Sequence, residues 1–182
     1  MTITPDDKDW TWVLEQPCDE CGCDTTDIAG AEVANRLRAN AGQWTTLLTS
    51  GDPAELKSRP TPETWSALEY GCHVRGVFVK FGERLQLMLR EDDPTFENWD
   101  QDQTALDKHY DQQDPATVGR DLDTAAQNCT AVLDGVPEDQ WERTGRRSNG
   151  SLFTVASLSR YLLHDPVHHL HDVTGKRYAE QS

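Results

Sequence analysis

The chain has 182 residues and a formal net charge of −15, because 32 Asp and Glu residues stand against 17 Lys and Arg residues. This charge argues against nucleic acid or an anionic membrane as a partner, since both need a basic surface. No stretch approaches the roughly 18–20 apolar residues of a membrane span, and Met1–Lys8 has no apolar secretory region, so we expect a cytoplasmic protein.

The first predicted helix covers about residues 31–49, where apolar side chains recur at spacings of three and four, and Gly51 ends it. The second helix has the clearest start in the chain. Ser66 as the N-cap and Glu69 three residues later form a capping box, and the helical pattern continues to about Arg90.

A long acidic loop is expected over residues 91–113, between the second and third helices. Residues 91–114 hold nine acids and one Lys, and a connection of this length is often functional. We expect Trp99 to anchor the loop by burial, and a role in holding substrate is the alternative. Whether the loop acts as a lid stays open.

The third helix is predicted to begin at Asp114, with Pro115 at its first helical position, and to end at Gly135. Asn149-Gly150 is a turn signal, so a short hairpin fits before the last helix.

The fourth helix is predicted to run from Thr154 to about Thr174, with Gly175 as its stop. Four helices, one long connection and no clear strand pattern indicate an all-α protein, a four-helix bundle. We divide the chain into an acidic, cysteine-bearing extension at 1–30, the bundle at 31–174 and a tail at 175–182.

Four of the six histidines lie in residues 164–171 of the last predicted helix. At about 100° per residue, His168 and His171 lie about 40° and 20° to either side of His164. On the same wheel His169 points about 140° away. A His-x-x-x-His pair presents two imidazoles to one metal ion. The alternative is a histidine patch at the surface or at a dimer contact.

His73, in an apolar stretch of the second helix, is the predicted third ligand for this pair. Its alternative is a hydrogen-bonded core histidine. Three imidazoles with open coordination positions are typical of a catalytic metal site. Glu69 lies one turn before His73 and is a candidate ligand or general base, but its place in the capping box explains it without chemistry. Asp165 and Asp172 either orient imidazoles or are exposed.

Cys18-Asp-Glu-Cys21-Gly-Cys23 suggests a zinc knuckle or a redox motif. No further Cys or His pair stands nearby in the sequence to complete four ligands. We therefore favour an ordered segment packed by Trp10 and Trp12, and the role of the three cysteines stays open. The cysteine total is odd, five, so we expect free thiols.

These residues resemble the DinB superfamily over about residues 31–174. The resemblance rests on Trp65-Ser66-x-x-Glu69-x-x-x-His73 in the second helix and on His164-x-x-x-His168 in the last. The superfamily includes metal-dependent thiol S-transferases and mycothiol-dependent maleylpyruvate isomerases. The stretch 145–155 and the histidine cluster look like the actinobacterial-type branch.

The resemblance implies a four-helix bundle, often a homodimer, with one divalent ion, zinc or nickel. The implied ligands are His73, His164 and His168, with water completing the coordination. Isomerases of the family commonly have a carboxylate as the middle ligand, so an all-histidine set is more similar to the S-transferases. The implied function is conjugation of a mycothiol-like thiol to a small electrophile through a metal-stabilised thiolate.

Two alternatives remain at this point. The same site could serve a metal-dependent hydrolase. The chain could also be a non-catalytic, stress-related metal-binding protein with a closed site, and His171 would then be the fourth ligand.

Overall fold

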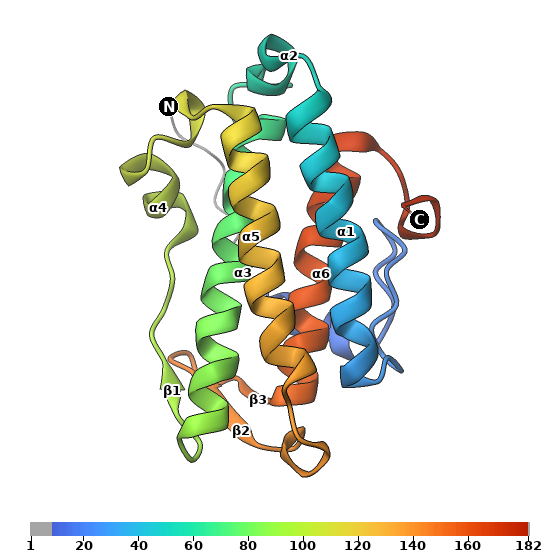
Figure 1. The fold of residues 1–182 in the computed structure, drawn as a ribbon, viewed down its shortest axis with the longest axis vertical. Helices are drawn as coiled ribbons and strands as arrows, with labels where there is room; N and C mark the ends of the chain where they lie inside the picture. Colours follow the sequence, from blue (N-terminus) through green and yellow to red (C-terminus); the bar gives the residue numbers. More distant parts are fainter. Residues whose placement is uncertain (1–8, 182) are drawn as a thin grey trace.

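The computed structural model describes residues 9–181, so the prediction about a secretory region at residues 1–8 lies outside the described residues. Four long helices form the bundle, which confirms the predicted fold class (Figure 1). They are α1 (Gly30–Ser50), α3 (Ala67–Arg90), α5 (Pro115–Asp134) and α6 (Val155–Thr174).

The order of the helices around the bundle differs from their order in the chain. Both α1 and α3 pack against α5 and against α6, so the consecutive helices α1 and α3 lie diagonally across the bundle. Helix α6 therefore lies between α1 and α3. In addition, the 3-10 helix η1 (Trp10–Leu14) packs on α6. Side chains on different faces of α6 thus meet different parts of the chain.

Local capping places the helix ends where the sequence predicts them. The Ser66 hydroxyl accepts a hydrogen bond from the Glu69 backbone N–H, and the Glu69 carboxylate accepts one from the Ser66 N–H, which completes the capping box. Asp114 caps α5, and Thr154 caps α6. Gly175 ends α6 in the left-handed region, with φ of 70°.

The connection between α3 and α5 contains regular structure as well as loop. It includes β1 (Thr95–Phe96), α4 (Gln101–Asp107) and the 3-10 helix η2 (Tyr110–Gln112). Asp100 starts α4, because its carboxylate accepts a hydrogen bond from the Gln103 N–H. Figure 1 shows this connection along the outer side of α3.

The predicted hairpin before the last helix is confirmed. Strands β2 (Thr144–Arg147) and β3 (Leu152–Thr154) pair antiparallel, with Gly145 opposite Phe153, and β1 adds to β2 in parallel. Gly145 has no room for a side chain, since a Cβ there would lie 2.6 Å from the Phe96 ring. In Figure 1 the hairpin lies at the lower end of the bundle.

The remaining short elements are α2 (Pro53–Lys57), η3 (Glu138–Gln140) and η4 (Tyr178–Glu180). The interior is apolar, and Trp44 and Phe78 are fully buried in it. Within residues 9–181, no helix combines the length and the apolar character needed to cross a membrane.

Candidate metal centres

Helix α6 carries potential metal ligands in two adjacent registers. His164 and His168 share one face, and Asp165 and His169 share a face rotated by about 100°. Each face meets a different partner. Asp165 and His169 form a group with His73 of α3, and His164 and His168 form a group with Cys18 and Cys21 of the N-terminal segment. In each group the potential ligand atoms all lie within 4.8 Å of one another.

The open group consists of His73, Asp165 and His169. Asp165 Oδ1 lies 3.5 Å from His73 Nε2 and 3.9 Å from His169 Nε2. Two ligands bound tetrahedrally to zinc at about 2.1 Å are separated by about 3.4 Å. Asp165 Oδ1 and both ring nitrogens of His73 are buried without a hydrogen-bond partner among the described residues. Since such atoms are costly, this donor set fits a metal ion.

Neighbouring side chains hold the two histidines of the open group in place. Asp172 Oδ2 lies 3.0 Å from His169 Nδ1, so a proton on Nδ1 would be donated to this carboxylate while Nε2 faces Asp165. The Trp99 indole stacks on His73, with ring centroids 5.4 Å apart. Gly76, one turn after His73, makes room for the indole, because a Cβ there would lie 3.1 Å from it.

The charge state of the ligands suits metal binding. Burial on its own would raise the pKa of Asp165, but the adjacent His73 and His169 lower it to about 2, so the group is a carboxylate at neutral pH. Burial lowers the pKa of His164 to about 4 and also lowers the pKa of His168. Both imidazoles are therefore neutral at pH 7, which is the form that binds metals.

A cavity of about 910 Å³ lies beside α6, and its lining includes Asp165 and His169 of the open group together with His164 and His168. Its walls combine aromatic rings with hydrogen-bonding groups. Five carboxylates line the cavity, and among its described lining residues Arg147 is the one cation. Arg146 instead pairs with Asp93. The aromatic residues are Trp10, Trp65, Tyr70, Trp99 and Tyr161, and the carboxylates are those of Glu63, Asp100, Asp102, Asp165 and Asp172.

The three ligands predicted from the sequence are divided between the two groups. The structure brings His164 and His168 together, and it places His73 with Asp165 and His169 instead. Among residues 9–181, no group of nearby ligand atoms joins all three predicted histidines. Asp165, expected to orient an imidazole or to be exposed, is therefore placed as a potential ligand.

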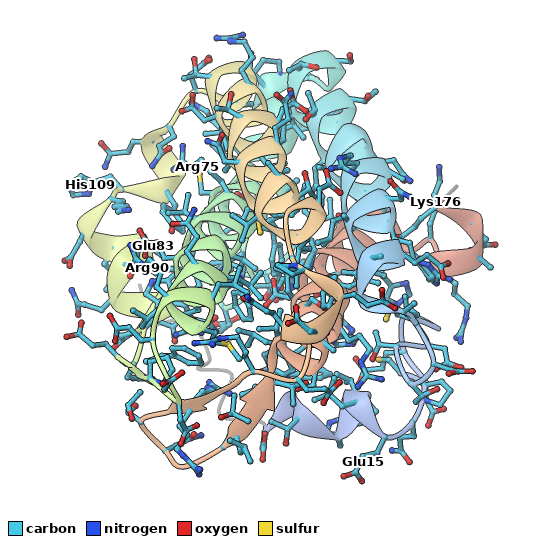
Figure 2. All side chains as sticks on the ribbon, turned by 60° about the horizontal axis from the view of Figure 1, so that its bottom comes forward. Glu15, Arg75, Glu83, Arg90, His109 and Lys176 are labelled. Carbon is cyan, nitrogen blue, oxygen red and sulfur yellow. The ribbon has the colours of Figure 1, made fainter. Side chains whose placement is uncertain are left out.

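The other candidate residues have separate environments. His171 Nδ1 lies 3.2 Å from the exposed carbonyl of Lys176, outside both groups. His109 is exposed and lies at the rim of the molecule (Figure 2). The Glu69 carboxylate is held by Arg59 and by the Ser66 N–H, in agreement with its capping role.

Asp165 and His169 could have been found from the sequence, because Asp165-x-x-x-His169 has the same spacing as His164-x-x-x-His168. The helical wheel indicates that the two pairs point in different directions. It cannot indicate which direction faces His73, since that depends on how α3 packs against α6.

The sequence model of the DinB superfamily matches residues 36–173, which is most of the chain. The chain belongs to the DinB superfamily. Among solved structures, its fold is similar to YfiT from Bacillus subtilis, described as "a probable metal-dependent hydrolase with an unusual four-helix bundle topology". The TM-score is 0.72 at 17% identity, over 82% of this chain and 88% of YfiT. No curated protein matches the chain.

In this DinB protein the two groups differ in how many of their residues lie inside the segment matched by the family model. All three residues of the open group lie inside residues 36–173. The second group combines His164 and His168, which are inside the match, with Cys18 and Cys21, which precede it.

Proposed function

We propose that this chain is a metal-dependent S-transferase that joins a low-molecular-weight thiol to a small electrophile. The observation that carries the proposal is the open group of His73, Asp165 and His169 beside the cavity. We take these residues as the ligand set because their donor atoms converge and include buried atoms without partners. Three protein ligands leave coordination positions for a substrate.

A divalent ion such as zinc or nickel held by this group would supply the Lewis acidity that turns a thiol into a thiolate at neutral pH. The chain's own residues prepare the site. Asp165 contributes a negative charge, and Asp172 orients His169. Trp99 and Trp65 pack against His73 and exclude water from it.

The cavity wall favours a hydroxyl-rich thiol over an anionic one. Sugar hydroxyls donate hydrogen bonds to carboxylates, and sugar rings stack on aromatic faces. The cavity wall has five carboxylates and one guanidinium, and this excess of negative charge repels anions. A mycothiol-like thiol meets these conditions. A carboxylate as the middle ligand is the pattern that the family resemblance gives for mycothiol-dependent isomerases. Asp165 therefore supports mycothiol as the thiol, and it does not favour S-transfer over isomerisation.

The test is a thiol-transfer assay with protein loaded with zinc or with nickel. Mycothiol and glutathione would each be offered with a fluorogenic alkylating electrophile. We expect turnover with mycothiol to exceed turnover with the anionic glutathione. We expect Asp165→Ala to lower kcat/KM by about 100-fold or more. Loss of a residue that only supports a metal ligand already lowers metal affinity or activity by about 10–100-fold.

His171→Ala is the matched control, because His171 is on the same helix but belongs to neither group. It should keep wild-type activity. Equal turnover by wild type and Asp165→Ala, in protein shown to be folded by circular dichroism, would contradict the proposal.

A hydrolase is the second candidate, and the likeness in fold to YfiT, with its description as a hydrolase, favours it. The same three ligands and cavity could serve attack by water. Ester or amide hydrolysis in the absence of any thiol, lost in Asp165→Ala, would favour this candidate over thiol transfer.

A further inference from the structure

We propose that Cys18, Cys21, His164 and His168 form a second metal site, a closed four-ligand zinc site that fastens the N-terminal segment to α6. This site does not depend on the proposed thiol transfer. It joins two pairs that are about 140 residues apart in the sequence. Each pair alone supplies half of a tetrahedral zinc site.

The spacing of the ligand atoms fits zinc bound by sulfur and nitrogen. Cys18 Sγ lies 3.6 Å from His168 Nδ1. With zinc–sulfur and zinc–nitrogen bonds of about 2.3 and 2.05 Å, a tetrahedral angle separates these two atoms by about 3.6 Å. His164 Nε2 is buried without a hydrogen-bond partner among the described residues, so it has a ligand position to fill.

The backbone of the cysteine loop is already folded for metal binding. The loop closes on itself, since the Gly22 N–H donates to the Cys18 carbonyl at 2.8 Å and the Cys18 N–H donates to the Cys23 carbonyl at 2.9 Å. Gly22 takes a φ of 76°, which favours glycine. The Cys23 N–H points at Cys21 Sγ from 3.5 Å, where it would stabilise a thiolate.

The histidine side of the site has the support that zinc ligands usually have. His168 turns Nδ1 toward Cys18, and its Nε2 lies 3.5 Å from Glu20 and 3.6 Å from Asp172. A carboxylate behind a ligating imidazole fixes its orientation and raises its basicity. Two thiolates would balance the charge of one zinc ion, and sulfur with nitrogen selects zinc over magnesium or calcium.

The four proposed ligands of this site are buried. The Trp10 ring packs against both imidazoles, with centroids 5.3 Å from His164 and 4.8 Å from His168. Trp10, His164 and His168 also line the cavity beside the open group. A zinc ion here would therefore hold a wall of that cavity in place.

The C-terminal tail reinforces the same loop. The Tyr178 N–H donates to the Cys21 carbonyl at 2.8 Å, and the Arg177 guanidinium donates to the Asp19 carbonyl at 2.9 Å. The proposed zinc site thus joins the N-terminal segment, α6 and the tail into one unit.

Cobalt substitution tests the site, because cobalt bound by thiolates gives an intense near-ultraviolet charge-transfer band. The full-length protein, purified without a histidine tag, would be stripped of metal under reducing conditions and titrated with Co²⁺. We expect the wild type to show the band at one equivalent, and Cys18→Ser and Cys21→Ser to lose it.

Two variants serve as controls. Cys23→Ser removes a buried cysteine of the same loop that is outside the group, and it should keep the band. Asp165→Ala removes a ligand of the open group and should also keep it, which separates this site from the proposed function. A band that survives in Cys21→Ser or disappears in Cys23→Ser would overturn the assignment.

A measurement on wild-type protein covers variants that fail to fold. Modification of the five thiols of the zinc-loaded protein with a mercurial reagent, with a dye to detect released zinc, should free one zinc ion per chain, while zinc held by the open group, which contains no thiol, stays bound. No release of zinc after all thiols have reacted would contradict the proposal. Freshly purified protein that lacks zinc and has a Cys18–Cys21 disulfide would also contradict it and would indicate a redox pair.

Discussion

The two groups on α6 differ in composition and in burial although their residues alternate along the same two turns. The open group combines two imidazoles with one carboxylate, and its Asp165 and His169 are partly exposed. The second group, Cys18, Cys21, His164 and His168, is called the closed group; all four side chains are buried and Trp10 packs on both imidazoles, although these imidazoles line the same cavity. Three ligands, two of them partly exposed, suit a reacting site, and four buried ligands suit a structural one.

The comparison shows how one helix can serve two purposes. A shift of one residue turns a side chain by about 100°, so neighbouring positions face different partners. Asp165 faces α3, and His164 faces the N-terminal segment. The chemistry of each group is then decided by what the facing segment supplies, a histidine in one case and two cysteines in the other.

The largest expected effect that separates the groups is on stability after zinc removal. Bound zinc at about 1,000 times its Kd stabilises the folded state by about 4 kcal/mol, which for a chain of this size corresponds to a Tm shift on the order of 10 °C. We expect this loss when a chelator is added to the wild type or to Asp165→Ala, measured by calorimetry. The chelator effect should be smaller in Cys21→Ser, because only the open group then holds zinc, and an equal effect in Cys21→Ser would contradict this ranking.

A somewhat smaller effect is expected from pH in the metal-free protein. The pKa of His164 falls to about 4 in the folded state because of burial, so the unfolded chain takes up a proton first as the pH drops. Folding stability should then decrease between about pH 6.5 and pH 4, by roughly 3 kcal/mol at the lower end. Urea unfolding at several pH values, compared with His164→Gln, measures this. The variant should have a flatter profile, and identical slopes would contradict the prediction.

Asp172 contacts both groups and allows a finer comparison. Its Oδ2 lies 3.0 Å from His169 Nδ1, and its Oδ1 lies 3.6 Å from His168 Nε2. We expect Asp172→Asn to weaken metal binding by the open group by about 10–100-fold. The metal affinity of the closed group should fall less, because the Glu20 carboxylate also lies close to His168. Competition titrations with a chromophoric chelator would compare the two affinities, and a greater loss at the closed group would reverse this ranking.

The smallest effect is expected from Gly76→Ala. The new Cβ would lie 3.1 Å from Trp99, so the indole has to move away from its stacked position on His73. The strain is about 1–3 kcal/mol, and the gain in helix propensity of about 1 kcal/mol partly offsets it. We expect KM to rise by a few-fold while the cobalt–thiolate band stays the same. An unchanged KM would show that Trp99 does not shape the open site.

The sequence predicts the bundle well because local signals set its helix ends. The capping box at Ser66, Asp114 before Pro115, and Thr154 all act within a few residues, and the structure uses each of them. Helix α4 is short, so it shows little apolar periodicity, and only the cap at Asp100 indicates it. Interactions local in the sequence are thus the readable part of the fold.

The sequence is less informative about the site, because both groups depend on packing over long sequence separations. It identifies His73, His164 and His168 as residues with metal chemistry, and the structure places each of them among potential ligands. It cannot decide which face of α6 meets α3. It also cannot show that Cys18 and Cys21 reach α6, since nothing near them in the sequence completes four ligands.

Anomalous X-ray diffraction at the zinc edge, on crystals of protein purified with zinc, would locate the bound metal ions. We expect two separate peaks per chain, one among Cys18, Cys21, His164 and His168 and the other among His73, Asp165 and His169. A single peak bound by His73, His164 and His168 would contradict the two-site assignment and support the ligand set predicted from the sequence alone.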